Sequence, residues 1–169
     1  MSNSIHVKFP DGSTTEVPKG TTALEVAKSI SPRLADAALV AKSNGDLIDL
    51  TRPLDSDTDL RIITEKDPEA LEVYRHSSAH LLAAAVLDLF PETKLGHGPA
   101  TENGFFYDFY RPAAFTPEDL EKIEKKMQEL VQQNLPYARE FLPRKEGLEK
   151  FKAEGDFMKC HFIEQFTKP

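Results

Sequence analysis

Residues 4–18 read SIHVKFPDGSTTEVP and predict the first piece of the fold. Residues 5, 7 and 9 are apolar and alternate with polar neighbours, the period of a half-buried strand. Pro10-Asp11-Gly12 has the composition of a turn, and residues 14–17 alternate again before Pro18. Two such runs around a tight turn indicate a β-hairpin.

A helix and three further strands follow along the chain. Thr22 and Glu25 have capping-box spacing at the start of an apolar stripe, and Pro32 predicts that this helix ends near Ser31. Ser43-Asn44-Gly45 lies between two apolar runs and indicates a second hairpin. Residues 60–64 supply a last strand. This order predicts a small α+β roll over residues 1–65.

The second half of the chain, residues 66–169, begins with a long helix. Asp67 as N-cap and Pro68 at the first helical position predict a start there and an end near Phe90. We expect its core stripe to be Leu71, Tyr74, Ser78, Leu82, Ala85 and Leu89, and an adjacent face with Val73, His76, His80 and Leu87 to line a cavity.

The remaining elements follow from local signals. We expect a hairpin of strands 95–101 and 105–110, and a helix over 116–134 that buries Ile123, Met127, Leu130 and Val131. Residues 137–142 predict a strand, residues 145–152 a short helix, and residues 156–166 an element of either type.

Composition excludes several classes of function. The 169 residues carry a net charge of −7, which argues against a general polyanion clamp. No apolar run approaches the ~20 residues of a membrane-spanning helix, and no secretory signal precedes the first strand. The single cysteine, Cys160, cannot form an internal disulfide, so we expect a cytoplasmic chain.

The strongest candidate for chemistry is the pair His76 and His80. On a helix, residues four apart project from one side, so the pair could hold a metal, position a water or relay protons. The pair is not the metalloprotease box, because Ser77 stands where that motif has glutamate. Structurally hydrogen-bonded histidines are also common, and two ligands leave a zinc site incomplete.

Two other segments invite a functional interpretation that their spacing does not favour. Cys160 and His161 are sequence neighbours, which point apart on a strand and about 100° apart on a helix, so both rarely serve one ion. Residues 102–108, ENGFFYD, are on spacing alone better explained by a tight turn and its aromatic strand than by a functional role.

Together these segments resemble a known family. Residues 75–82, RHSSAHLL, then Gly98-Pro99, then residues 103–108, NGFFYD, are similar in order and spacing to the start of the editing domain of bacterial threonyl-tRNA synthetase. Residues 9–12, 20–22 and 46–50 resemble the TGS domain, a ubiquitin-like β-grasp module that precedes the editing domain in that family. The resemblance therefore implies a TGS domain over residues 1–65 and part of an α+β editing domain over 66–169, of the type shared with alanyl-tRNA synthetase.

The resemblance also implies a reaction and its residues. In the family this domain hydrolyses tRNA(Thr) mischarged with serine. Its His-x-x-x-His falls on His76 and His80, which would position the hydrolytic water or the terminal ribose. Its aromatic residue after Asn-Gly-Phe falls on Tyr107, and its lysine falls on Lys159, which would contact the terminal nucleotide or influence the water.

The chain departs from the family in one respect. The family completes its editing pocket with a downstream Cys-x-x-x-His element, for which this chain has no counterpart; Cys160 has no histidine four residues later. We therefore expect an N-terminal fragment, truncated on its C-terminal side and inactive alone. ATP, zinc and homodimerisation are expected only of the full-length family member, with no cofactor in this segment and tRNA(Thr) as partner.

Two alternatives remain at this point. A noncatalytic TGS-containing module that binds RNA or a partner protein is one, because TGS modules also occur in ribosome-associated GTPases and stringent-response enzymes. A free-standing zinc-dependent trans-editing hydrolase is the other. The His-x-x-x-His helix directly after the TGS segment favours the synthetase over the binding module. The trans-editing hydrolase is disfavoured because its downstream ligands are absent and because it gains nothing from a TGS module.

Overall fold

The computed structural model describes residues 3–136, 138 and 140–166. The chain divides into two compact units, residues 1–74 and 75–169, and the division falls within one helix, α3 (Glu69–Leu89). Each unit is treated by itself below.

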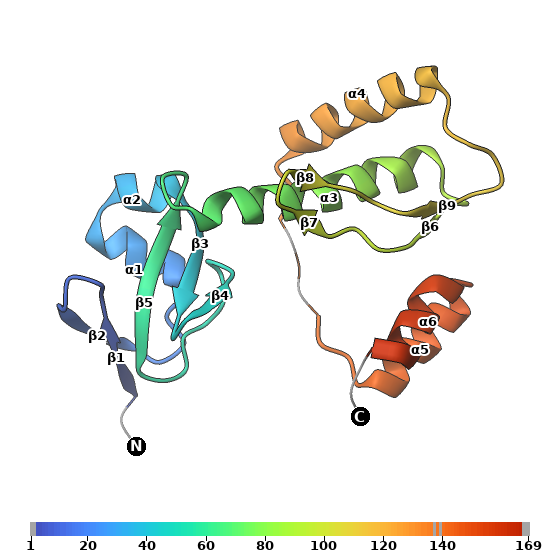
Figure 1. The fold of residues 1–169 in the computed structure, drawn as a ribbon. Coiled ribbons are helices and arrows are strands. Elements are labelled where there is room, and N and C mark those ends of the chain that lie inside the picture. The colour runs from blue at the N-terminus through green and yellow to red at the C-terminus, as the bar shows by residue number, and fades with distance from the viewer. Residues whose placement is uncertain (1–2, 137, 139, 167–169) are drawn as a thin grey trace. The chain divides into compact units, whose positions relative to one another are not determined.

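The first unit contains a five-stranded mixed sheet (Figure 1). Its strands are β1 (Ser4–Lys8), β2 (Thr14–Pro18), β3 (Ala38–Ser43), β4 (Asp46–Ile48) and β5 (Thr58–Thr64). They lie in the order β2-β1-β5-β3-β4; β1 is parallel to β5, and the other pairs are antiparallel. This is a β-grasp-like sheet, which agrees with the α+β roll predicted for this part of the chain.

Both hairpins form at the predicted turns. β1 and β2 pair from Ser4↔Pro18 to Lys8↔Thr14 around the Pro10-Asp11-Gly12 turn. Between β3 and β4, Asn44 has φ 50° and Gly45 has φ 96°. Two successive residues at positive φ are what a type I′ turn requires, and Asn-Gly meets that requirement at low cost.

Helix α1 (Ala23–Ile30) covers one face of this sheet, and its capping box forms as predicted. Glu25 N donates to Thr22 Oγ1 at 3.2 Å, and Thr22 N donates to Glu25 Oε2 at 2.8 Å. Val26 packs into a core with Ile5, Val7 and Leu60. α1 ends at Ile30 as predicted, because Ser31 is extended at φ −165° and ψ 143°. Ser31 then caps a second helix, α2 (Pro32–Ala37), in which Pro32 takes the first position.

The start of α3 packs on the opposite face of the sheet. Ala70 and Val73 contact Val40 and Ile63. Arg61 on β5 donates to Asp67 at 2.5 Å and to Glu69 at 3.2 Å, which fixes the entry to the helix. The predicted stripe is wrong at its beginning, since Leu71 is 53% and Tyr74 70% exposed. The face of α3 that packs on the sheet carries the small Ala70 and the branched Val73, because the helix lies close against the sheet.

In the second unit α4 (Pro117–Gln133) runs along α3 (Figure 1). Ala85 and Val86 of α3 and Ile123 of α4 form the buried centre, with Leu82, Leu89, Met127 and Leu130 packed against it. Thr116 and Asp119 make the capping box that opens α4, and Asn134 ends it at φ 47°. Val131, predicted to be buried, is 62% exposed, because it lies about 100° around the helix from Leu130, which packs against the buried centre.

The predicted hairpin of residues 95–110 forms, but it is interrupted. Its outer ladder pairs β6 (Lys94–Leu95) with β9 (Phe109–Tyr110), and its inner ladder pairs β7 (Ala100–Thr101) with β8 (Gly104–Phe105). Between them Gly96 N donates to Asp108 O at 2.8 Å, and Asp108 N donates to His97 O at 2.9 Å. The two arms therefore stay together through the gap.

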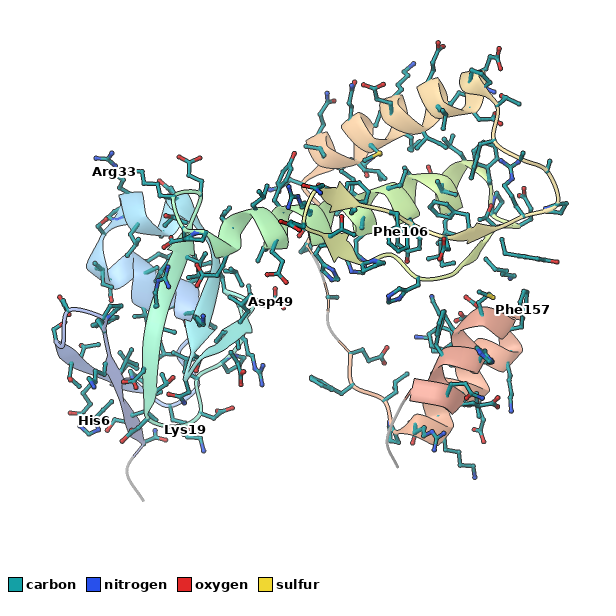
Figure 2. All side chains as sticks on the ribbon, in the orientation of Figure 1. His6, Lys19, Arg33, Asp49, Phe106 and Phe157 are labelled. Carbon is teal, nitrogen blue, oxygen red and sulfur yellow. The ribbon has the colours of Figure 1, made fainter. Side chains whose placement is uncertain are left out.

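Two short helices end the described chain. They are α5 (Arg144–Ala153), as predicted, and α6 (Phe157–Phe166), where the sequence left the type of element open. Phe157 at the start of α6 (Figure 2) makes an edge contact with Tyr110 of β9, with ring centroids 5.3 Å apart. The strand predicted over 137–142 falls partly outside the described residues; residues 138 and 140–142 belong to no helix or strand.

No helix among the described residues is long and apolar enough to cross a membrane.

Candidate functional site

His76 and His80 lie in the C-terminal part of α3, which belongs to the second unit. The helical spacing brings their Nε2 atoms to 3.1 Å, with ring centroids 4.6 Å apart at an interplanar angle of 81°. Both residues are exposed, rather than packed into an apolar core. A substrate or a water molecule can therefore reach the ring nitrogens.

The close contact constrains the protonation of the pair. A hydrogen bond between two ring nitrogens needs one N–H donor and one bare acceptor, so at least one of the two imidazoles is neutral. Partial desolvation of the His80 ring, and secondly the nearby His76, lower the pKa of His80 below its usual value. At neutral pH His80 is therefore uncharged and able to accept a proton.

Arg75, the residue before the pair, fastens the helix to the hairpin. Its Nη1 donates to Thr101 O at 3.1 Å and to Glu102 O at 2.6 Å. These two carbonyls begin the turn that carries Asn103 and Gly104. The guanidinium therefore connects the helix segment 75–82 to the turn that begins segment 103–108. The family resemblance had related these two segments only by their order along the chain.

Tyr107 lies in the gap between the two ladders of the hairpin. Its ring stacks on Phe109 with centroids 5.0 Å apart, and its other neighbour is Gly98 on the facing arm. A Cβ built on Gly98 would lie only 2.3 Å from Cδ2 of Tyr107. Burial, with a smaller contribution from the charge of Asp156, raises the pKa of Tyr107, so its hydroxyl stays protonated at neutral pH.

Lys159 lies in the first turn of α6. Its Nζ is 3.8 Å from Oδ2 of Asp156 and 4.7 Å from the centre of the Phe151 ring. Two groups of candidate residues result. Lys159, its ion-pair partner Asp156 and Tyr107, on which the charge of Asp156 acts, come from α6 and the hairpin. His76 and His80, which contact each other, come from α3.

Cys160 and His161 do not converge. Cys160 is buried as a free thiol, whereas His161 is exposed and makes an edge contact with Phe162. This is the arrangement expected of neighbours on a helix. Among the described residues no group of three or more His, Cys, Asp or Glu side chains could hold a metal ion, so the histidine pair is not part of a complete metal site there.

Sequence reasoning did not single out Arg75 or Asp156 for a role of its own. The contact of Arg75 is with carbonyl groups, for which sequence carries no signal. Asp156 follows Gly155 directly before a helix, which is the pattern of an N-cap and was available in the sequence.

Comparison with known proteins gives the family context. The TGS domain family matches residues 5–64. The threonine–tRNA ligase of Acidobacterium capsulatum is 53% identical over 202 residues, which cover 100% of this chain and 30% of the ligase. The corresponding ligases of Rickettsia peacockii and Maricaulis maris are 52% and 50% identical over 159 residues, covering 94% of this chain and 25% of each ligase.

The chain thus spans between a quarter and a third of the length of the curated relatives that it matches. The matches extend over both compact units, and the TGS match coincides with the β-grasp-like sheet. Along its whole length the chain is therefore similar to the N-terminal segment of threonine–tRNA ligases, and residues 5–64 match the TGS domain family.

Proposed function

We propose that this chain supplies a TGS domain, residues 1–65, and the first part of an editing domain, residues 66–169, to a threonine–tRNA ligase. The editing part contributes to hydrolysis of the ester in Ser-tRNA(Thr). The observation that carries the proposal is the exposed pair His76 and His80, whose Nε2 atoms lie 3.1 Å apart with His80 held in the neutral form.

The chemistry of the pair suits ester hydrolysis. A neutral imidazole accepts a proton from a water molecule as its oxygen attacks the carbonyl carbon of the seryl ester. The bond between that carbon and the ribose oxygen then breaks, and the ribose oxygen takes up a proton. Because His76 and His80 share a hydrogen bond, the proton taken from water can pass along the pair to the leaving group.

Tyr107 and Lys159 have supporting roles in this proposal. The Tyr107 hydroxyl, protonated at neutral pH, can donate a hydrogen bond to the substrate. The ammonium group of Lys159 suits the phosphate of the terminal nucleotide. Neither role needs a metal ion or a cofactor in this segment.

The biological logic is a second sieve. Serine lacks the methyl group of threonine, and one methyl group changes binding by only about 1–3 kcal/mol. A site that admits serine and rejects the larger threonine corrects the error that the first site makes. For the whole ligase, attachment of threonine with ATP, a zinc ion, a homodimer and a cytoplasmic location belong to the same proposal, as does recognition of tRNA(Thr).

The test is deacylation of Ser-tRNA(Thr) by the chain extended through the family's Cys-x-x-x-His element, called the extended chain below. We expect the extended chain to hydrolyse the ester and His80→Ala to lower the rate about 100-fold or more, the usual effect of losing a general base. His6→Ala, which changes an exposed histidine on β1, is the matched control and should leave the rate unchanged. Equal rates for His80→Ala and wild type would remove the pair from the mechanism.

A further inference from the structure

Asp156 is a buried carboxylate next to a candidate site residue. It lies between α5 and α6, is 8% exposed, and takes no part in the hydrolysis proposed above. Burying an ionised carboxylate is costly unless it is paired and hydrogen-bonded. Its partners therefore indicate what holds it there.

The first role of Asp156 is to begin α6. Its Oδ1 accepts a hydrogen bond from Lys159 N at 3.1 Å, and its carbonyl oxygen accepts one from Cys160 N at 3.1 Å. These contacts are those of an N-cap. The preceding turn is fixed as well, since Asp156 N donates to Phe151 O at 2.9 Å and Gly155 has φ +65°.

The second carboxylate oxygen is free for a different partner. Oδ2 lies 3.8 Å from Nζ of Lys159, and the same Nζ lies over the Phe151 ring. The Lys159 side chain is 39% exposed, against 12% for Asp156. The carboxylate is thus the anchored partner, and the lysine is the partner that still reaches solvent.

We propose that Asp156 is a positioning residue of the candidate editing site: one carboxylate oxygen caps α6 while the other holds the Lys159 ammonium group in the orientation that receives the tRNA end. Without the ion pair, the four-carbon side chain of Lys159 samples many rotamers, and substrate binding must order it. The effect of the Asp156 charge on the Tyr107 hydroxyl agrees with a carboxylate that faces the site. The inference rests on the proposed function.

The Asp156→Asn substitution separates the two roles of Asp156. Asparagine caps helices as well as aspartate does, so Asp156→Asn keeps α6 and removes only the charge that holds Lys159. Glu164→Gln is the matched control, because Glu164 is an exposed acid of the same helix paired with Lys152 at 3.8 Å. Circular dichroism and urea denaturation should show all variants folded.

The decisive experiment is a double-mutant cycle of Asp156→Asn and Lys159→Met in the extended chain, with kcat and KM measured on Ser-tRNA(Thr). We expect Asp156→Asn to raise KM about two- to fivefold, the size of a partly exposed ion pair, with a smaller change in kcat. In the Lys159→Met background the same substitution should change nothing. An equal loss in both backgrounds, or no effect where Lys159 is present, would overturn the proposal.

A second readout does not depend on hydrolysis. Reductive methylation of the lysines with ¹³C-labelled methyl groups gives one NMR resonance per lysine, and Lys159→Met identifies the resonance of Lys159. Asp156→Asn should move that resonance toward those of unpaired lysines, whereas Glu164→Gln should leave it in place. If the extended chain hydrolyses nothing, the proposed function fails and this resonance alone decides whether Asp156 positions Lys159.

Discussion

Gly98→Ala should displace Tyr107 from the candidate site. The added Cβ would lie 2.3 Å from Cδ2 and 2.4 Å from Cε2 of the Tyr107 ring. Ordinary contacts between carbon atoms are about 3.5–4.0 Å, so the ring or the hairpin arm must move by more than about 1 Å. The ring cannot simply slide back, because its stack on Phe109 limits it on the hairpin.

The expected cost follows from the size of the overlap. Overpacking of this kind destabilises by about 1–3 kcal/mol. A displacement of about 1 Å at a site residue can also lower a reaction rate about 100-fold. Hydrogen exchange, followed by mass spectrometry on peptides covering 94–110, measures the first effect, and deacylation by the extended chain measures the second.

The control for Gly98→Ala is a second glycine substitution in the same hairpin. Gly104→Ala places a methyl group in the same hairpin with no atom within 4 Å, so it should change the free energy of local opening by less than about 0.5 kcal/mol. Gly98→Ala should become harmless when combined with Tyr107→Ala, which removes the clashing ring. If Gly98→Ala behaves like Gly104→Ala, the reasoning about this contact is wrong.

Three further predictions concern the two units. Thr116→Ala removes the capping box of α4 and should cost about 1 kcal/mol of unfolding free energy in urea denaturation, whereas Thr116→Ser keeps the acceptor and should cost much less. Leu60→Ala empties a position that is 1% exposed and should cost about 2–5 kcal/mol, while Leu39→Ala, at 49% exposed, should cost little; equal costs would refute the core assignment. Desolvation and His76 lower the pKa of His80 in the folded chain, so the unfolded chain takes up a proton first as pH falls toward and below 6.5. The unfolding free energy should therefore decrease as pH falls, and His80→Asn should flatten this dependence between pH 7.5 and 5.5.

Local signals in the sequence predicted much of the fold. The capping box at Thr22, the helix that begins after Thr116 and the Asn44-Gly45 turn all form, because each depends on residues within a few positions of one another. The i, i+4 contact of His76 and His80 follows from helix geometry in the same way.

The features that sequence reasoning missed depend on long-range packing. Leu71 and Tyr74 are exposed because the sheet accepts Ala70 and Val73, a choice that the periodicity of the helix alone does not reveal. Asp156 gains its importance from its contact with Lys159 and its charge near Tyr107, which only the folded second unit brings about. The predicted end of α1 before Pro32 is confirmed, but α2 was not predicted, although Ser31-Pro32 both ends α1 and begins α2.

The most direct test of the account compares two esters on one protein. Deacylation of Ser-tRNA(Thr) and of Thr-tRNA(Thr) by the extended chain is measured side by side, with His80→Ala as the inactive reference. The account predicts rapid loss of the seryl ester, little loss of the threonyl ester, and neither above background with His80→Ala. A wild-type extended chain that binds tRNA(Thr) but spares both esters would contradict the editing function and leave the TGS-containing binding module in its place.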